Sequence, residues 1–272
     1  SSNNIEIVIH LAGHNDFSRK KGDPFVEAKD NLAGFLNILK ITNACSIKKF
    51  INVTYASKAN LTCGEEEKSE LTLDERYKEA QNNPLTITDM VEEMYGGLWS
   101  HMNDTQALSL RVSNVYGPQD IYTNEKSKIS QMIEEAIDAK IIKLRRYKDC
   151  MDDYIYIDDV AYAVQRACEF FDSPSIDIKS GKVVTIDQVI EVIQKLDPTV
   201  TVDKKGYIPE NKCAQSERSR SENKALDELG WTPFISIEEG IKRTYDWTKK
   251  TRVKVEDKRE RFSFIKGILK NR

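Results

Sequence analysis

Short runs of β-branched and apolar residues alternate with segments of helical periodicity along the first half of the chain. The strand-like runs cover residues 5–12, 50–54 and 107–112, and the helical segments cover residues 23–39, 88–102 and 129–139. The runs are continuous rather than alternating, which is typical of strands buried on both faces. Because parallel strands need crossover helices, this order predicts a doubly wound α/β protein with helices on both faces of a parallel sheet.

The pattern changes after about residue 173. Short strand-like runs follow, with helical segments over residues 186–196 and 221–229, and Gly230 closes the second segment as a helix C-cap. This predicts a smaller α+β lobe at the C-terminal side. The expected division is a partial Rossmann-like domain over residues 1–172, a smaller substrate-type lobe with returning elements over 173–248, and a basic C-terminal helix or tail over 249–272.

Charge and composition narrow the functional classes. The 272 residues carry a formal net charge of -3, with 39% hydrophobic and 31% charged residues, which is typical of a globular protein with a solvated surface. No overall basic field points to nucleic acid, although local basic clusters exist. No apolar run approaches the ~20 residues that span a bilayer, so no membrane association is expected. The polar N-terminus leads directly into a strand, which argues against a signal peptide and leaves an upstream segment open.

The cysteine pattern predicts free thiols and no metal site. The five cysteines are Cys45, Cys63, Cys150, Cys168 and Cys213. They form no CxxC pair, and the three histidines do not complete a zinc pattern. Free thiols favour the cytoplasm or another reducing compartment, with import into an organelle left open.

Six stretches carry motifs in a consistent order. They are VIHLAG (8–13), DP with NLAG (23–24 and 31–34), KFINVT (49–54), LRVSNVYGP (110–118), DYIYIDDVA (153–161), and LGWTP with EG and W (229–233, 239–240 and 247). Together they resemble the extended short-chain dehydrogenase/reductase family, the NAD-dependent epimerases and dehydratases of nucleotide-sugars. The resemblance spans nearly the whole chain. It implies a Rossmann-like fold that begins here at the fourth strand, with the N-terminal strands and their glycine-rich cofactor loop outside this sequence.

The same resemblance implies a catalytic Tyr, used as acid and base, with a Lys four residues later on one helical face. Aligning Pro84 and Glu93 with the family pattern PYxxxKxxxE places Leu85 at the Tyr position and Asp89 at the Lys position. Leucine cannot transfer a proton, and aspartate has the wrong charge to lower the pKa of a tyrosine. The chain therefore resembles a degenerate member of the family.

Thr54 is the one weak catalytic candidate. The family places a Ser or Thr near this strand end to hydrogen-bond the reacting oxygen, but the best match for the Ser itself is Ala56. Two pairs elsewhere have the Tyr-x-x-x-Lys spacing, namely Tyr122 with Lys126 and Tyr245 with Lys249. Both lie in the wrong part of the sequence for a catalytic role.

By resemblance, the cofactor-facing positions that remain are Ala12, Gly13, Asn31 and Thr54, and the cofactor, if any binds, is NAD or NADP. The alternative is structural: small residues where a strand meets a helix, and an asparagine that caps or braces. Asn114 matches the family's substrate-facing asparagine, and its alternative role is to stabilise the turn.

The family often has an arginine, which contacts the substrate diphosphate, where this chain has Asp152. A carboxylate at contact would repel a diphosphate by roughly 1–4 kcal/mol in a partly screened site. The upstream basic residues Lys143, Arg145, Arg146 and Lys148 either compensate for this repulsion or form a solvated face.

Three functions remain open at this stage. The first is a non-catalytic binding or assembly component, whose partner is a protein complex or RNA. The second is an active nucleotide-sugar epimerase or dehydratase whose cofactor-binding segment lies outside this sequence. The third is a sensor that binds NAD(P) or a nucleotide-sugar. The resemblance also implies a homodimer through the helices near Asn31 and Glu93, since the segment 88–102 keeps apolar residues for such a contact.

Overall fold

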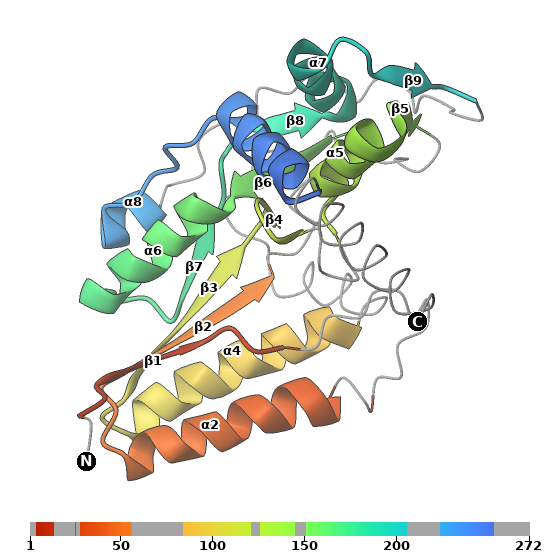
Figure 1. Cartoon of the computed structure of the whole chain (residues 1–272). Coiled ribbons are helices and arrows are strands. Elements are labelled where there is room, and N and C mark those ends of the chain that lie inside the picture. Colours follow the sequence, from red (N-terminus) through yellow and green to blue (C-terminus); the bar gives the residue numbers. More distant parts are fainter. Residues whose placement is uncertain are drawn as a thin grey trace, which may run out of the picture. The chain divides into compact units, whose positions relative to one another are not determined.

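The computed structural model describes residues 4–13, 25, 28–55, 84–120, 126–144, 151–205 and 224–252. The chain divides into two compact units, each built from separate stretches of sequence (Figure 1). Unit 1 comprises Ser1–Val115, Asp149–Thr185 and Pro209–Ile235, and unit 2 comprises Tyr116–Lys148, Ile186–Ile208 and Ser236–Arg272. The expected division at residues 172 and 248 stays a prediction, and residues 253–272 of the expected basic tail lie outside the described residues.

Unit 1 is built on a four-stranded parallel sheet. Its strands are β1 (Ile7–His10), β2 (Lys49–Tyr55), β3 (Gln106–Val112) and β7 (Ser175–Ile178), in the order β1-β2-β3-β7. The first three correspond to the three predicted strands. Parallel pairing throughout, with helices in the connections, confirms the predicted Rossmann-like α/β class.

Helices α2 (Ala33–Ala44) and α4 (Pro84–Met102) cover one face of this sheet, and the chain enters α2 through a π-helical turn, η1 (Ala28–Leu32) (Figure 1). Phe35 and Leu39 of α2 form a buried cluster with Phe50 of β2 and Ala107 of β3. Pro84 is the first residue of α4, where its missing N–H leaves no hydrogen bond unmade. The helix predicted from residue 88 therefore begins one turn earlier.

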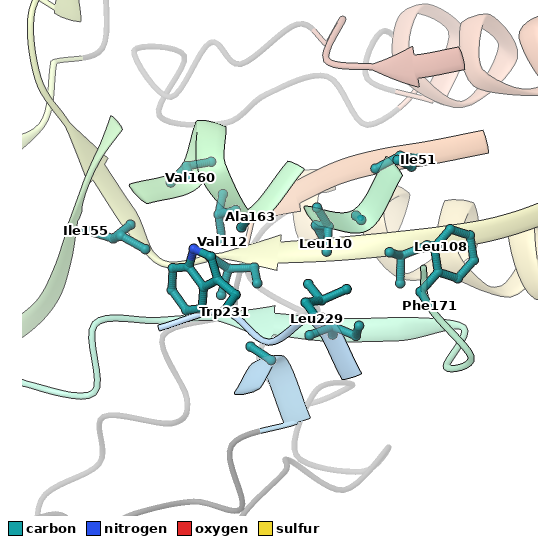
Figure 2. Packing of buried hydrophobic residues seen from close by; sticks show 14 residues of the cluster. Ile51, Leu108, Leu110, Val112, Ile155, Val160, Ala163, Phe171, Leu229 and Trp231 are labelled. Carbon is teal, nitrogen blue, oxygen red and sulfur yellow. The ribbon is translucent and has the colours of Figure 1, made fainter. Parts of the chain in front are cut away.

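Helices α6 (Ile157–Glu169) and α8 (Lys224–Leu229) pack on the other face. Successive side chains of a strand point to opposite faces, so Phe50 joins the α2 cluster while Ile51 joins the cluster under α6. Figure 2 shows Val112, Ala163 and Trp231 lying together in this second cluster. Trp231 is only 1% exposed, and it is one of the largest fully buried side chains.

Asp159 fastens the LGWTP motif to the start of α6. Its carboxylate accepts hydrogen bonds from the backbone N of Phe234 at 2.9 Å and of Ile235 at 3.3 Å. Nε1 of Trp231 donates to the carbonyl oxygen of Asp159 at 2.9 Å. Gly230 ends α8 at φ +58, a left-handed conformation that glycine adopts without steric cost. Two motifs far apart in the sequence thus form one structural joint.

A second, three-stranded sheet contains β4 (Asn114–Tyr116), β6 (Met151–Tyr156) and β8 (Val183–Thr185), in the order β4-β6-β8. Strands β6 and β8 run antiparallel, with Met151 opposite Thr185. Strand β6 passes directly into α6, so Asp158 and Asp159 fall in the first helical turn, where negative charge is favoured.

Unit 2 combines helices α5 (Lys128–Ala139) and α7 (Ile186–Leu196), helical residues 237–252, and the short parallel strands β5 (Ile141–Lys143) and β9 (Thr201–Asp203). Ser127 caps α5, since its hydroxyl accepts a hydrogen bond from the backbone N of Ser130 at 3.2 Å. The buried residues of this unit include Ile129, Met132, Ile133, Ile193 and Ile241.

Among the described helices, none combines the length and the apolar character needed to cross a bilayer.

Candidate functional site

The site residues predicted from the sequence lie where the strands of unit 1 end. Gly13 follows β1, Thr54 is close to the end of β2, and Asn114 follows β3 by one intervening residue. Because these three strands are paired in parallel, their carboxyl ends share one edge of the sheet. Open α/β sheets bind their ligands outside this edge. The candidate site is therefore assigned to this edge of unit 1.

Gly13 and Asn31 are neighbours in space. A Cβ atom on Gly13 would lie 3.9 Å from Oδ1 of Asn31. Asn31 is buried and belongs to η1, and single π-helical turns recur at functional sites in proteins. Two of the four predicted cofactor-facing positions are thus brought together, one on the strand end and one on the helix that packs beside it.

Thr54 and Ala12 lie equally far beyond a pair of matched residues on adjacent strands. His10 of β1 pairs with Asn52 of β2. Thr54 lies two residues after Asn52 within β2, and Ala12 lies two residues after His10, beyond the end of β1. Thr54 is buried, and it shares the α2 and α4 face of the sheet with Asn52, because residues two apart point the same way. Ala12 is exposed.

An ion pair sets the rotation of α4 relative to the sheet. Nη1 of Arg111 on β3 lies 3.5 Å from Oε1 of Glu93, and its Nε lies 2.6 Å from Oδ1 of Asp177 on β7. Burial favours a higher pKa for Asp177, but Lys179 and Arg111 outweigh it and hold this pKa below its usual value. With Glu93 fixed in this way, Leu85 falls in the first turn of α4 and Asp89 one turn later.

Asn114 is joined to strand β6. Its Nδ2 donates to Oδ1 of Asp152 at 2.9 Å and to the carbonyl oxygen of Asp153 at 3.1 Å. Asp152 is only 3% exposed, so its carboxylate is held by the protein rather than presented at the surface. Asp152 stands where the family often has an arginine that contacts the substrate diphosphate. It is hydrogen-bonded here to Asn114, the residue predicted to bind substrate.

Asp153 holds the turn before β8 against the end of β3. Its carboxylate accepts hydrogen bonds from the hydroxyl of Ser113 at 3.1 Å and from the backbone N of Ser180 and Gly181, each at 2.9 Å. Burial raises the pKa of Asp153, and these hydrogen bonds oppose that rise. The role of Asp153 is structural, because its accepting oxygens are directed at the protein.

Sequence reasoning missed a buried contact between β2 and α4. Nδ2 of Asn52 donates to Oε2 of Glu92 at 3.0 Å, and both residues are buried. Burial raises the pKa of Glu92, and the Asn52 hydrogen bond lowers it by less. Glu92 lies seven residues after Leu85, and this spacing predicts that the two share a face of the helix. Nothing in the sequence indicated that Asn52 would be the partner of Glu92.

Tyr245 in unit 2 is hydrogen-bonded within the protein. Its hydroxyl donates to Oδ2 of Asp197 at 2.8 Å, and Lys140 also bonds that carboxylate at 2.6 Å. Burial, together with the Asp197 carboxylate, raises the pKa of Tyr245 to about 12. A phenol with this pKa is a poor general base near neutral pH.

Several predicted residues lie outside the described residues. They are Ala56, Tyr122, Arg145, Arg146 and Lys148. In the part of the chain that the structure describes, no group of three or more His, Cys, Asp or Glu side chains is arranged to hold a metal ion.

Comparison with known proteins identifies the class. Residues 1–179 match the NAD dependent epimerase/dehydratase family, and the chain belongs to that family. A putative UDP-glucose 4-epimerase of Methanocaldococcus jannaschii is 26% identical over 247 residues, which cover 90% of this chain and 77% of that protein.

Solved structures agree with the assignment. A UDP-glucose 4-epimerase of Thermotoga maritima, determined with UDP-glucose, superposes with a TM-score of 0.71 at 25% identity, covering 90% of this chain and 78% of that one. The enzyme WbmF of Bordetella bronchiseptica, determined with NADH, shares the fold with a TM-score of 0.73 at 21% identity, covering 94% of this chain and 76% of that one. Solved neighbours of this chain include structures determined with NAD or with NADH.

Proposed function

We propose that this chain is a family member that performs no hydride transfer of its own and serves as a binding or assembly component. The observation that carries the proposal is the register of α4. The family pattern around Pro84 and Glu93 assigns Leu85 and Asp89 to the Tyr and Lys positions, and the contact of Arg111 with Glu93 supports this register. Leucine has no proton to transfer, and a carboxylate would raise the pKa of a nearby phenol.

Thermal unfolding with and without NAD(H) and NADP(H) tests the proposal. Ligand at ~100 times its dissociation constant adds about 2.7 kcal/mol to stability. For a chain of this size that gain raises the melting temperature by roughly 5–10 °C. The proposal expects no such rise with well-folded protein. A rise of this size would show that Ala12, Gly13, Asn31 and Thr54 still form a cofactor site, and would favour the sensor or the enzyme.

An active epimerase or dehydratase is the second candidate, because the similarity to named epimerases covers 90% of the chain. This candidate requires a proton donor other than residue 85. Turnover of UDP-glucose or UDP-glucuronate separates it from a sensor, which would bind NAD(P) or a nucleotide-sugar without converting it. Asn114 would then contact the sugar nucleotide, and its substitution by Ala would weaken that binding.

For assembly, a second copy of this chain fits the exposed face of α4. The large apolar side chains that α4 exposes recur at helical spacing, and they are Ile87, Met94, Tyr95, Leu98 and Met102. Helix α2 packs beside α4 and adds Ile41, which is 54% exposed. Contiguous apolar surface of this kind marks interaction sites, and a two-fold axis would pair it with itself. A protein of another kind, or RNA, is the alternative partner.

A further inference from the structure

Helix α4 places a glutamate against the middle of the parallel sheet. Glu92 is 6% exposed, and its Oε2 accepts the 3.0 Å hydrogen bond from Asn52, which is 2% exposed. Asn52 pairs with His10 of β1 and with Ser109 of β3 in the parallel register. His10, Asn52 and Ser109 therefore form a polar row across one face of the sheet. The carboxyl group of Glu92 on α4 bonds the middle residue of this row.

The helix lies close to the sheet on both sides of Glu92. Thr88, one turn earlier, is 3% exposed. A Cβ atom on Gly96, one turn later, would lie 3.6 Å from Cβ of Ala107 in β3, which is ordinary van der Waals contact. An ionised carboxylate at Glu92 would therefore lose most of its hydration, and such a loss is costly without a cationic partner.

Among the described residues, the elements around Glu92 carry the charged groups Lys29 and Asp30 on η1, Lys40 on α2, Lys49 on β2, Arg111 on β3, and Asp89, Glu93 and His101 on α4. The cations of the two strands, Lys49 and Arg111, have partners of their own. Arg111 bonds Asp177 and contacts Glu93, and Lys49 donates to the carbonyl oxygens of Cys168 and Glu169. His10, in the same polar row, is half-buried between Phe35 and Phe50.

We propose that Glu92 is a proton-dependent clamp, whose neutral carboxyl holds α4 on β2 through Asn52 and whose ionisation loosens that helix from the sheet. A neutral carboxyl still offers an accepting oxygen to Asn52, so the hydrogen bond persists while the buried charge is avoided. The pKa of Glu92 is higher in the folded chain than in the unfolded one. Its stabilisation is therefore complete at low pH and is lost as the pH rises through the raised pKa.

Hydrogen exchange of α4 as a function of pH tests the clamp. In the wild-type chain, the equilibrium constant for opening of residues 84–102 should rise with pH by up to about tenfold per pH unit, after correction for the intrinsic exchange rate. Glu92→Gln keeps the accepting oxygen and removes the ionisation, so this rise should disappear. Glu238→Gln is the matched control, because Glu238 is an exposed glutamate of the other unit and its removal should leave the rise unchanged.

If the Glu92→Gln chain does not fold, a second measurement on wild-type protein still tests the proposal. In wild-type protein with ¹³C-labelled glutamate carboxyls, one resonance should titrate at distinctly higher pH than the others. Equal pH dependence of α4 opening in wild type and Glu92→Gln would overturn the proposal. So would a set of glutamate resonances that all titrate in the ordinary range.

Discussion

His10 belongs to the polar row of the sheet and also contacts two aromatic rings. Its ring lies 5.9 Å from the ring of Phe35 and 6.0 Å from that of Phe50, measured between centroids. Burial lowers the pKa of His10, because the apolar rings disfavour the imidazolium. The folded chain therefore binds a proton at His10 less readily than the unfolded chain does.

This difference predicts how stability depends on pH. A group with a lowered pKa contributes stability above its unfolded pKa, about 6.5 for His, and that contribution is lost as the pH falls toward the folded value. The unfolding free energy of wild type should therefore fall more steeply between about pH 7 and pH 5 than that of His10→Phe. Urea titrations at several pH values measure the difference, and parallel curves for the two proteins would contradict this account of His10.

Replacing Asp159 is expected to lower the stability of unit 1. Asp159→Ala leaves the part-buried backbone N–H groups of Phe234 and Ile235 without this acceptor, and each unsatisfied group costs about 1–3 kcal/mol when fully buried and less here. The unfolding free energy should fall by roughly 1–3 kcal/mol. Asp159→Asn retains one accepting oxygen and should lose less. Chemical denaturation of the three proteins checks this order, and an unchanged Asp159→Ala protein would show that the joint carries no stability.

At the level of elements, apolar runs predicted β1, β2 and β3, and helical spacing predicted α7 at its observed bounds, 186–196. These elements follow from local periodicity, which a sequence displays directly. The π-helical turn η1 was not predicted, because one inserted residue leaves no distinct apolar pattern. Helix α6 was also missed as an element, since its motif was interpreted only as a family signature.

The candidate site was only partly predictable. The family motifs located Gly13, Asn31 and Thr54, and the structure brings the first two together. The contacts of Asp152 with Asn114 and of Glu92 with Asn52 were not foreseen. Each joins side chains that are forty or so residues apart, and such pairing depends on strand register and helix rotation rather than on local pattern.

The exposed face of α4 predicts self-association. Met94 is 66% exposed and Leu98 is 51% exposed, so changing either to Lys should leave the fold intact while placing a charge in the proposed interface. Light scattering after size exclusion should give a dimer mass for wild type and a monomer mass for Met94→Lys and Leu98→Lys. Lys242→Ala, an exposed change in unit 2, is the control and should remain dimeric. A monomeric wild type would rule out this interface.

At the scale of the whole molecule, the chain keeps the fold of its family, and we propose that the positions the family uses for proton transfer have changed. The parallel sheet, the joint at Asp159 and the contact of Arg111 with Glu93 are structural features that specify the fold. In the proposed alignment, Leu85 and Asp89 would contribute no chemistry that the family's relay requires. Since a fold can persist without its chemistry, the proposed binding or assembly role is compatible with family membership.

The most direct measurement is turnover of a nucleotide-sugar. The purified chain is incubated at high concentration with NAD⁺ and UDP-glucose or UDP-glucuronate, and epimer formation is followed by NMR. Thr54→Val, purified in parallel, controls for contaminating enzyme, because a contaminant would act equally in both samples. The proposed function predicts no epimer above background in either sample. Conversion that rises in proportion to wild-type protein, and is reduced in Thr54→Val, would contradict it and establish the chain as an active enzyme.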